Sequence, residues 1–395
     1  MCNKNVATSD KSAELLKEPS KTENPAGLHK RYNPPPVVSQ TTILLIGFAI
    51  FGLAMIWPPL ILFVTYAASV LIPYCFRVND DACMRRQLFA EFQKDESLPI
   101  DFLQTPKDIE MEESYWVNKR GMCLCTATMA PKDIPIKAVV CFSHGFTDHS
   151  SFMKRVEHQR LVRRGIAVVY IEIEGHGRSD GDMCLISDWD VMTDDVADFF
   201  QHVRKTKFKG KPFFLMGESM GGAISYTVYN KIPEVFKGVI FQAPMVKISD
   251  ETLPPKFLIN LLEKLLNPRS ITSGLGYLPL APADNKLHEY LGTNKESLEI
   301  VDRCPTLFSR NPRLKTAQTL LDVTKNISQT LSQFNAPFLV QHGSADRITD
   351  PKLSQALYDE SKSTDKTIKI YDGKSNRSGC LAFAFFSTFL CTNYF

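Results

Sequence analysis

The sequence has little net charge and lacks the cysteine spacing of a disulfide scaffold or a metal site. Lys and Arg together number 46 and Asp and Glu 43, so nothing in the charge balance indicates a nucleic-acid partner. None of the ten cysteines forms a Cys-x-x-Cys pair, and several lie in apolar runs, where a free thiol behaves as a small hydrophobic group. These features favour a reducing compartment such as the cytosol for the soluble part.

Charged residues are absent from Tyr32 to Phe76, and the part from Ile43 onward is almost continuously apolar. A helix needs roughly 20 apolar residues to cross a bilayer, so this run can cross once. Pro58 and Pro59 divide it into halves that are each too short to span. We therefore predict a membrane segment over 41–76 that passes once. A shallow hairpin in one leaflet and a buried core helix are the alternatives, and the flanking charges favour no orientation.

Two further segments lack the composition of a folded core. Residues 1–40 carry few large apolar groups and are predicted to be a disordered tail. Residues 77–111 are mixed and charged, with some helical character around Met84–Phe92, and are predicted to be a linker.

From residue 112 the pattern changes to short apolar runs that alternate with helical stretches. Buried apolar strands in such alternation predict an α/β domain with a mostly parallel sheet of eight strands and helices on both faces. Residues 245–330 interrupt the alternation and are predicted to form a helical cap, within a domain that covers 112–373. The predicted strands are Ser114–Val117, Met122–Thr128, Ala138–Phe142, Ile166–Ile173, Phe213–Met216, Gly238–Gln242, Pro337–Gln341 and Thr367–Tyr371.

The segment Gly217–Gly222 (Gly-Glu-Ser-Met-Gly-Gly) lies between the apolar run ending at Met216 and a helical stretch that can continue to Pro233. Strand, sharp Gly-x-Ser-x-Gly turn and helix together predict a nucleophile elbow with Ser219 at its tip. The alternative is a glycine-rich turn in some other α/β domain.

Acyl transfer at Ser219 would need two backbone donors for the developing oxyanion. One is expected from Met220, directly after the nucleophile, and the other from Phe146 in the loop that follows the third strand. We expect the side chain of His144, in the same loop, to be satisfied by local hydrogen bonds.

Several motifs together resemble the monoacylglycerol lipase and lysophospholipase group of α/β-hydrolases, in particular its plant-type branch and the serine aminopeptidase-like hydrolases. The resemblance covers about residue 112 to Gly373 and implies an α/β-hydrolase fold, cleavage of acyl esters, and no metal or organic cofactor. The matching stretches are Val117–Gly121, His144–Phe146, Glu174–Ser179, Gly217–Gly222, Ala243–Met245, Asn311–Ala317, His342–Asp346 and Thr349–Pro351.

The resemblance assigns the nucleophile to Ser219 and the acid that orients the histidine to Asp346. The family histidine should follow the last strand, near Asn376, but all eight histidines lie at or before His342. His176 and His342 are expected to be structural. Residues 374–395 match nothing in the family and are predicted to be a divergent C-terminal tail, derived from an altered exon, a retained intron or a frame change. The alternative is a diverged, catalytically weakened member.

We therefore expect a membrane-anchored serine hydrolase that cleaves esters of long-chain acyl lipids, with its activity in doubt because the histidine is absent. Its partners would be a monoacyl lipid or another small ester, and the membrane. The alternative is a non-catalytic relative that binds acyl lipids or proteins. A basic cluster at Arg204–Lys211 is expected to be a solvated loop, or else a contact for anionic lipid headgroups.

Overall fold

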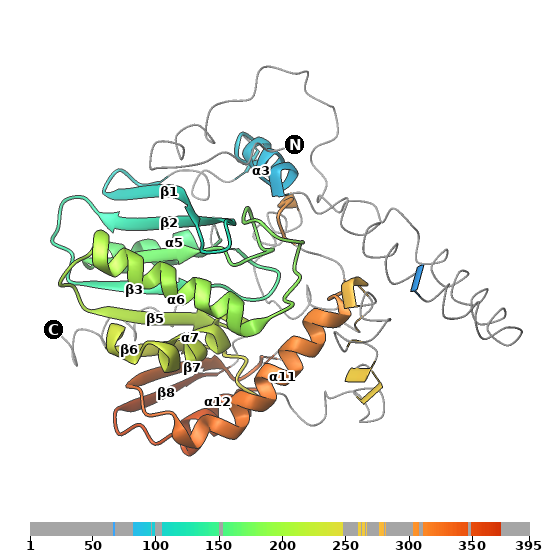
Figure 1. Ribbon diagram of the computed structural model, residues 1–395. Coiled ribbons are helices and arrows are strands. Elements are labelled where there is room, and N and C mark those ends of the chain that lie inside the picture. Colours follow the sequence, from blue (N-terminus) through green and yellow to red (C-terminus); the bar gives the residue numbers. More distant parts are fainter. Residues whose placement is uncertain are drawn as a thin grey trace, which may run out of the picture.

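The computed structural model describes the hydrolase domain and parts of the segments around it (Figure 1). The described residues are 66–67, 82–95, 97–98, 105–149, 153–247, ten residues within 260–281, 303–307, 311–346 and 349–372.

Eight strands form one sheet in the order β1-β2-β4-β3-β5-β6-β7-β8. β2 pairs antiparallel with both of its neighbours, and all pairs from β4 to β8 are parallel. The predicted mostly parallel eight-stranded sheet is confirmed. The strands are β1 (Ile109–Val117), β2 (Cys123–Pro131), β3 (Ala138–Ser143), β4 (Ile166–Ile171), β5 (Phe213–Glu218), β6 (Gly238–Gln242), β7 (Phe338–Gly343) and β8 (Lys366–Tyr371).

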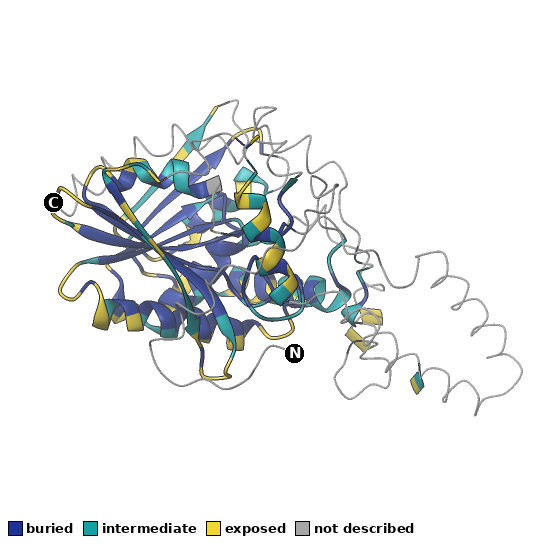
Figure 2. Cartoon of the chain, turned by 90° about the horizontal axis from the view of Figure 1, so that it is seen from above, coloured by how far each residue is buried: buried dark blue, intermediate teal, exposed yellow. Residues whose placement is uncertain are grey.

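Helices cover both faces of the sheet, because every residue of the central strands β3 and β4 is buried and needs apolar partners on each side. One core contains apolar residues of α6 (Trp189–Thr206), α7 (Met220–Lys231), α11 (Leu314–Thr330) and α12 (Pro351–Glu360). On the other face, Leu161 and Val162 of α5 (Met153–Val162) belong to a second core. Figure 2 shows the buried strands as a twisted layer between helices.

The ends of the long helices follow local sequence signals. Asp188 caps α6 by accepting a hydrogen bond from Val191 N. Asp350 caps α12 in the same way, with its Oδ1 atom 2.9 Å from Lys352 N, and Pro351 occupies the first helical position. Thr349–Pro351, one of the family-like stretches, is therefore a helix start.

The segment predicted as a linker, 77–111, contains ordered parts of the domain. Helix α3 (Ala82–Gln93) has a fully buried Arg85 and a buried Phe89, and β1 begins at Ile109, three residues before the predicted boundary at 112. After β1, a turn at Lys119–Gly121 leads into β2, with Gly121 at φ 76°.

The predicted tail 1–40, most of the membrane run and the divergent tail 374–395 lie outside the described residues. Within the described part, no helix is both long enough and apolar enough to cross a bilayer. Of the cap predicted over 245–330, the structure describes α11 and several short pieces. The described cysteines include five free thiols, whereas Cys83 of α3 is disulfide-bonded, which the spacing did not predict.

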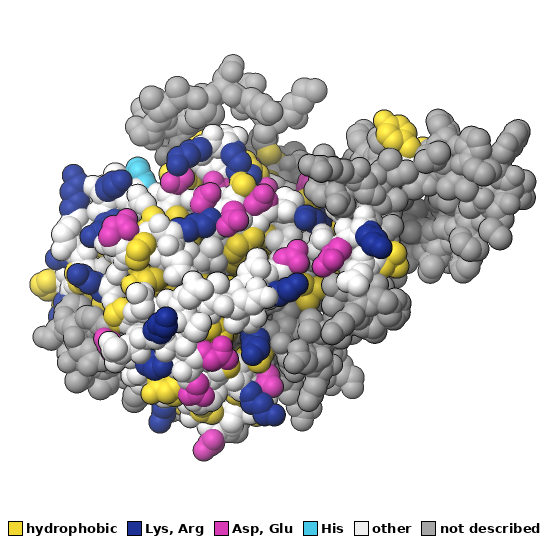
Figure 3. Space-filling model, turned by 60° about the horizontal axis from the view of Figure 1, so that its bottom comes forward, with side chains coloured by type: hydrophobic (Ala, Val, Ile, Leu, Met, Phe, Trp, Pro, Cys, Tyr) yellow, Lys and Arg dark blue, Asp and Glu magenta, His cyan; other side chains and the backbone are white. Residues whose placement is uncertain are grey.

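The described surface carries charges of both signs. On the face in Figure 3, Lys and Arg side chains alternate with Asp and Glu side chains. Several are paired, for example Lys207 with Glu112 and Lys231 with Asp194. Exposed pairs of this kind each contribute little to stability, at most about 1 kcal/mol.

Candidate active site

The predicted site residues follow the carboxyl ends of parallel strands. Register pairs Ser143 with Gly217, and Gln242 with both Glu218 and Gln341, so β3, β5, β6 and β7 end at one edge of the sheet. The 144–149 loop, Ser219 and Asp346 come directly after these ends. In open α/β sheets, ligands bind outside this edge.

Ser219 occupies the tip of a strained turn between β5 and α7. Its φ of 54° is rare for a residue with a side chain. Three backbone hydrogen bonds hold it there: Ser219 N donates to Gln242 O, and both Gly222 N and Met245 N donate to Ser219 O. Although Ser219 is the N-cap of α7, its hydroxyl makes no capping bond and it is partly exposed. The turn therefore presents the hydroxyl instead of using it in the fold, as the elbow prediction requires.

Glycines allow this turn to pack against the neighbouring strand. A Cβ on Gly221 would overlap the carbonyl oxygen of Ser143, and a Cβ on Gly217 would overlap the carbonyl oxygen of Gly221. Gly145 faces the same turn, but a Cβ there would lie 3.6 Å from the Ser219 Cβ, which is an ordinary contact.

Gly221→Ala is therefore expected to lower the free energy of unfolding by about 1–3 kcal/mol, because backbone atoms must move to relieve the overlap. Gly145→Ala is the matched control and should change the free energy of unfolding by less than about 0.5 kcal/mol. Urea unfolding followed by circular dichroism measures both. Equal stability of the two variants would contradict the packing described for the turn.

The 144–149 loop lies against Ser219, as the distance from Gly145 indicates. Met220 is the first residue of α7, so its N–H has no acceptor within the helix. Phe146, the other predicted donor, is half-buried, and its ring contacts the ring of His176. The structure thus brings the Phe146 loop and the start of α7 to the same side chain, Ser219.

His144 is buried and held locally, as predicted. One ring nitrogen lies 2.8 Å from Gly145 O, and the other accepts a hydrogen bond from Ile173 N. These bonds fix the loop at the end of β3, but they leave the ring with no nitrogen for acid or base chemistry.

Asp346 is buried just beyond β7. Its carboxylate accepts hydrogen bonds from Thr349 N and Thr349 Oγ1, and His342 Nε2 lies 3.3 Å from its Oδ2 atom. His342 is itself engaged, with Nδ1 2.6 Å from Ser354 Oγ and Nε2 2.8 Å from Thr349 O. The candidate acid is therefore positioned at the predicted edge, and His342 is structural, as expected.

The other buried histidines near the site are also engaged. His149 Nε2 lies 2.9 Å from Thr306 Oγ1, and His176 Nδ1 lies 3.0 Å from Glu174 O. Within the described part of the chain, no histidine is hydrogen-bonded to Ser219. Asn376, at the family position for the histidine, lies outside the described residues.

One ion pair at the site was not predicted from the sequence. Glu218, directly before Ser219, pairs with Lys154 of α5, and both side chains are more than nine-tenths buried. Lys154 also lies 3.6 Å from Glu157. The pair joins the end of β5, directly before the nucleophile, to α5. Because these residues are far apart in the chain, no local pattern could have indicated the contact.

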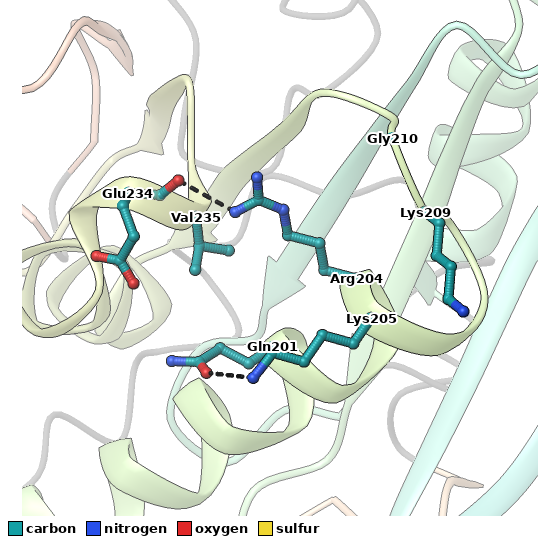
Figure 4. Close-up of a pocket in the computed structure, with 7 residues that line it drawn as sticks. All are labelled: Gln201, Arg204, Lys205, Lys209, Gly210, Glu234 and Val235. Carbon is teal, nitrogen blue, oxygen red and sulfur yellow. Dashed lines mark hydrogen bonds between the residues drawn. The ribbon is translucent and has the colours of Figure 1, made fainter.

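The basic cluster lies away from this edge. Arg204, Lys205 and Lys209 line a cavity of about 350 Å³ between the end of α6 and the turn at Pro233–Val235 (Figure 4). Arg204 donates to Glu234 O, and Lys205 donates to Gln201 Oε1. The cavity adjoins the loop that enters β5, at the strand's opposite end from Ser219, so it is not part of the candidate site.

The sheet and the serine elbow define an α/β-hydrolase, and comparison with known proteins identifies the family. Residues 134–375 match the family model described as serine aminopeptidase, S33. The chain belongs to this family, which confirms the predicted resemblance. It is 32% identical over 282 residues to caffeoylshikimate esterase of Arabidopsis thaliana, covering 70% of this chain and 82% of that one. It is 30% identical over 271 residues to human monoglyceride lipase, covering 68% and 85%.

Solved structures agree with the fold. A soluble variant of monoglyceride lipase from Saccharomyces cerevisiae, in complex with a substrate analog, superposes with a TM-score of 0.60 at 18% identity, covering 74% of this chain and 97% of that one. Monoacylglycerol lipase of Paleococcus ferrophilus superposes with a TM-score of 0.54 at 22% identity, covering 68% and 98%. At these identities the likeness concerns the fold alone.

Proposed function

We propose that this protein is a membrane-attached hydrolase of monoacyl esters whose catalytic serine is Ser219. The observation that carries the proposal is the strained, partly exposed Ser219 at the carboxyl edge of the sheet, with the 144–149 loop beside it. Membership of the S33 family and similarity to two ester-cleaving relatives support it.

In the proposed reaction, Ser219 Oγ attacks the ester carbonyl and forms an acyl-enzyme, with release of the alcohol. The N–H groups of Phe146 and Met220 stabilise the tetrahedral oxyanion, and water then cleaves the acyl-enzyme. Asp346 orients the histidine that should take the serine proton. No metal or organic cofactor takes part.

The sequence has no histidine at the position where the family places this base. The family match ends at residue 375, immediately before Asn376, and no histidine follows His342 in the sequence. Without a base, Ser219 keeps its proton at neutral pH and is a weak nucleophile. We therefore propose that this chain binds its ester but turns it over very slowly, and lipid binding without catalysis is the second candidate function.

Two classes of substrate follow from the two relatives. A glycerol monoester and a caffeoyl ester both present one acyl group, and they differ in the acyl part and the alcohol.

Initial rates on monooleoylglycerol, a lysophospholipid, a caffeoyl ester and trioleoylglycerol, each with a Ser219→Ala control, test the proposal. Ser219-dependent hydrolysis of a monoacyl ester is expected, however slow. Failure to bind or hydrolyse any monoacyl ester would contradict it.

Attachment to the membrane is proposed from the uncharged run Tyr32–Phe76. Deleting residues 1–78 keeps α3 and the hydrolase domain intact and is expected to move the protein from the carbonate-resistant membrane pellet to the supernatant. Release of the full-length chain by carbonate would contradict the anchor. If the truncated protein stays in the pellet, then the run is not the sole attachment.

A further inference from the structure

Helix α3 begins a few residues after the predicted membrane segment and is bound firmly to the hydrolase domain. The guanidinium of Arg85 is completely buried and donates to three backbone carbonyls, at 2.9 Å to Gly177 O, 2.6 Å to Ser179 O and 3.1 Å to Gly181 O. Arg86 adds a bond to Arg178 O and an ion pair with Asp180. A buried charge is costly unless it is hydrogen-bonded. The three carbonyl acceptors supply those bonds, so Arg85 fixes α3 against the turn 175–181.

Phe89, one turn further along α3, reaches the 144–149 loop. Its ring lies beneath the Arg178 guanidinium, 4.8 Å from ring centroid to Cζ, and meets the His149 ring edge-on with centroids 5.6 Å apart. His149 is the last described residue of the loop that carries Phe146. A shift of α3 would therefore move the loop that carries Phe146, the predicted oxyanion donor.

His149 in turn binds the segment Arg303–Leu307, from the connection between β6 and β7. Its Nε2 atom lies 2.9 Å from Thr306 Oγ1 and 3.3 Å from Cys304 Sγ. Both partners are buried, and Cys304 is completely inaccessible to solvent. The imidazole thus lies between α3 on one side and this segment on the other.

A second, independent contact joins the same two parts of the chain. Just after α3, Asp95 pairs with Arg303, which also donates to Ser97 Oγ at 2.8 Å. Burial raises the pKa of Asp95, but hydrogen bonds from Ser97 and the Arg303 guanidinium outweigh it and hold the pKa at about 2. The carboxylate is therefore charged at neutral pH, and the pair is intact.

We propose that α3, together with Asp95 and Ser97, forms a clasp that positions the site. Phe89, acting through His149, holds the 144–149 loop against the segment Arg303–Leu307, and the Asp95–Arg303 pair holds the clasp closed. Phe89 and His149 are positioning residues in this account. The inference rests on the proposed function only in taking the 144–149 loop as the source of an oxyanion donor.

Cys304 reports directly on the clasp. Burial raises the pKa of its thiol to about 12, so alkylation requires the segment to open. The full-length protein in mild detergent is treated with N-ethylmaleimide, and modification of each cysteine is followed by peptide mass spectrometry. Phe89→Ala is expected to increase the rate at Cys304 by about tenfold or more, and Asp95→Asn by a smaller factor, because local opening governs the rate.

Two controls separate the clasp from general loosening of the fold. Cys141, buried in β3, should stay unreactive in every variant, and Met84→Ala, on the exposed side of α3, should leave Cys304 unchanged. In Phe89→Ala, the rate of hydrogen exchange of residues 144–149 should increase together with the rate of Cys304 alkylation.

An unchanged Cys304 rate in both clasp variants, or equal increases at Cys304 and Cys141, would overturn the proposal. If Phe89→Ala does not fold, the Cys304 rate in Asp95→Asn decides it. None of these readouts needs ester turnover, so loss of the proposed activity would not be mistaken for failure of the clasp.

Discussion

Replacing residues 374–395 with a family-like segment that carries a histidine about three residues past Gly373 is expected to raise kcat on a monoacyl ester by up to about 10⁶. The reason is the catalytic base that we propose this chain lacks, because loss of the histidine from a comparable triad lowers kcat by a factor of that order. The other candidate residues are in place: Ser219 is partly exposed at the elbow, and Asp346 lies just beyond β7. The hydrogen bonds of His144 and His342 argue against their serving as substitutes.

Two variants give this prediction its controls. Asn376→His alone should restore much less, because the chain around it must also place the ring between Asp346 and Ser219 at hydrogen-bond distance. Ser219→Ala in the replaced chain should return the rate to the background. Similar rates before and after replacement would show that another group deprotonates Ser219.

Acid is expected to unfold the domain well above the pH at which its carboxylates titrate. Burial lowers the pKa of His149 to about 4 and of His158 and His176 to about 3, from an ordinary value of 6.5. These rings are neutral in the folded state, so below pH 6.5 the unfolded state binds more protons. The contribution of these neutral rings to the free energy of unfolding is therefore fully present above pH 6.5. It is lost progressively as the pH falls from 6.5 toward the folded-state pKa values of about 4 and about 3. Between pH 7.5 and 5 the loss should be roughly 2 kcal/mol for each histidine and roughly 6 kcal/mol for the three.

Urea unfolding at a series of pH values tests this directly. His158→Gln and His176→Gln should each reduce the slope of stability against pH by about 1.4 kcal/mol per pH unit between pH 6 and 5, whatever their effect at pH 7.5. His202→Gln, at an exposed position on α6, is the matched control and should keep the original slope. A slope that none of the buried-histidine variants changes would contradict the assignment of acid sensitivity to these rings.

Much of the fold was predictable because its signals are local. The apolar runs around Val140, Val168 and Leu215 became buried strands, since strands covered on both faces admit almost only apolar side chains. The elbow was equally predictable, because the glycines at 217 and 221 are required by contacts within a few residues and with the adjacent strand.

What could not be predicted depends on contacts between distant parts of the chain. Helix α3 carries two arginines and only a weak apolar stripe, so its composition indicated a linker, yet Arg85 is completely buried against a turn more than 90 residues away. The His149–Thr306 bond spans 157 residues. Polar contacts of this kind are specified by the packed domain, and nothing in the local pattern distinguishes a buried arginine from an exposed one.

The most direct test of the central claim is labelling of Ser219 by a fluorophosphonate probe. The unmodified chain, the chain with the replaced C-terminal segment and its Ser219→Ala variant are treated side by side, and the labelled peptide is identified by mass spectrometry. We predict rapid labelling at Ser219 in the replaced chain alone, with very slow labelling of the unmodified chain and none in the Ser219→Ala variant. Labelling of the unmodified chain at the same rate as the replaced chain, or no labelling of Ser219 in either, would contradict the account.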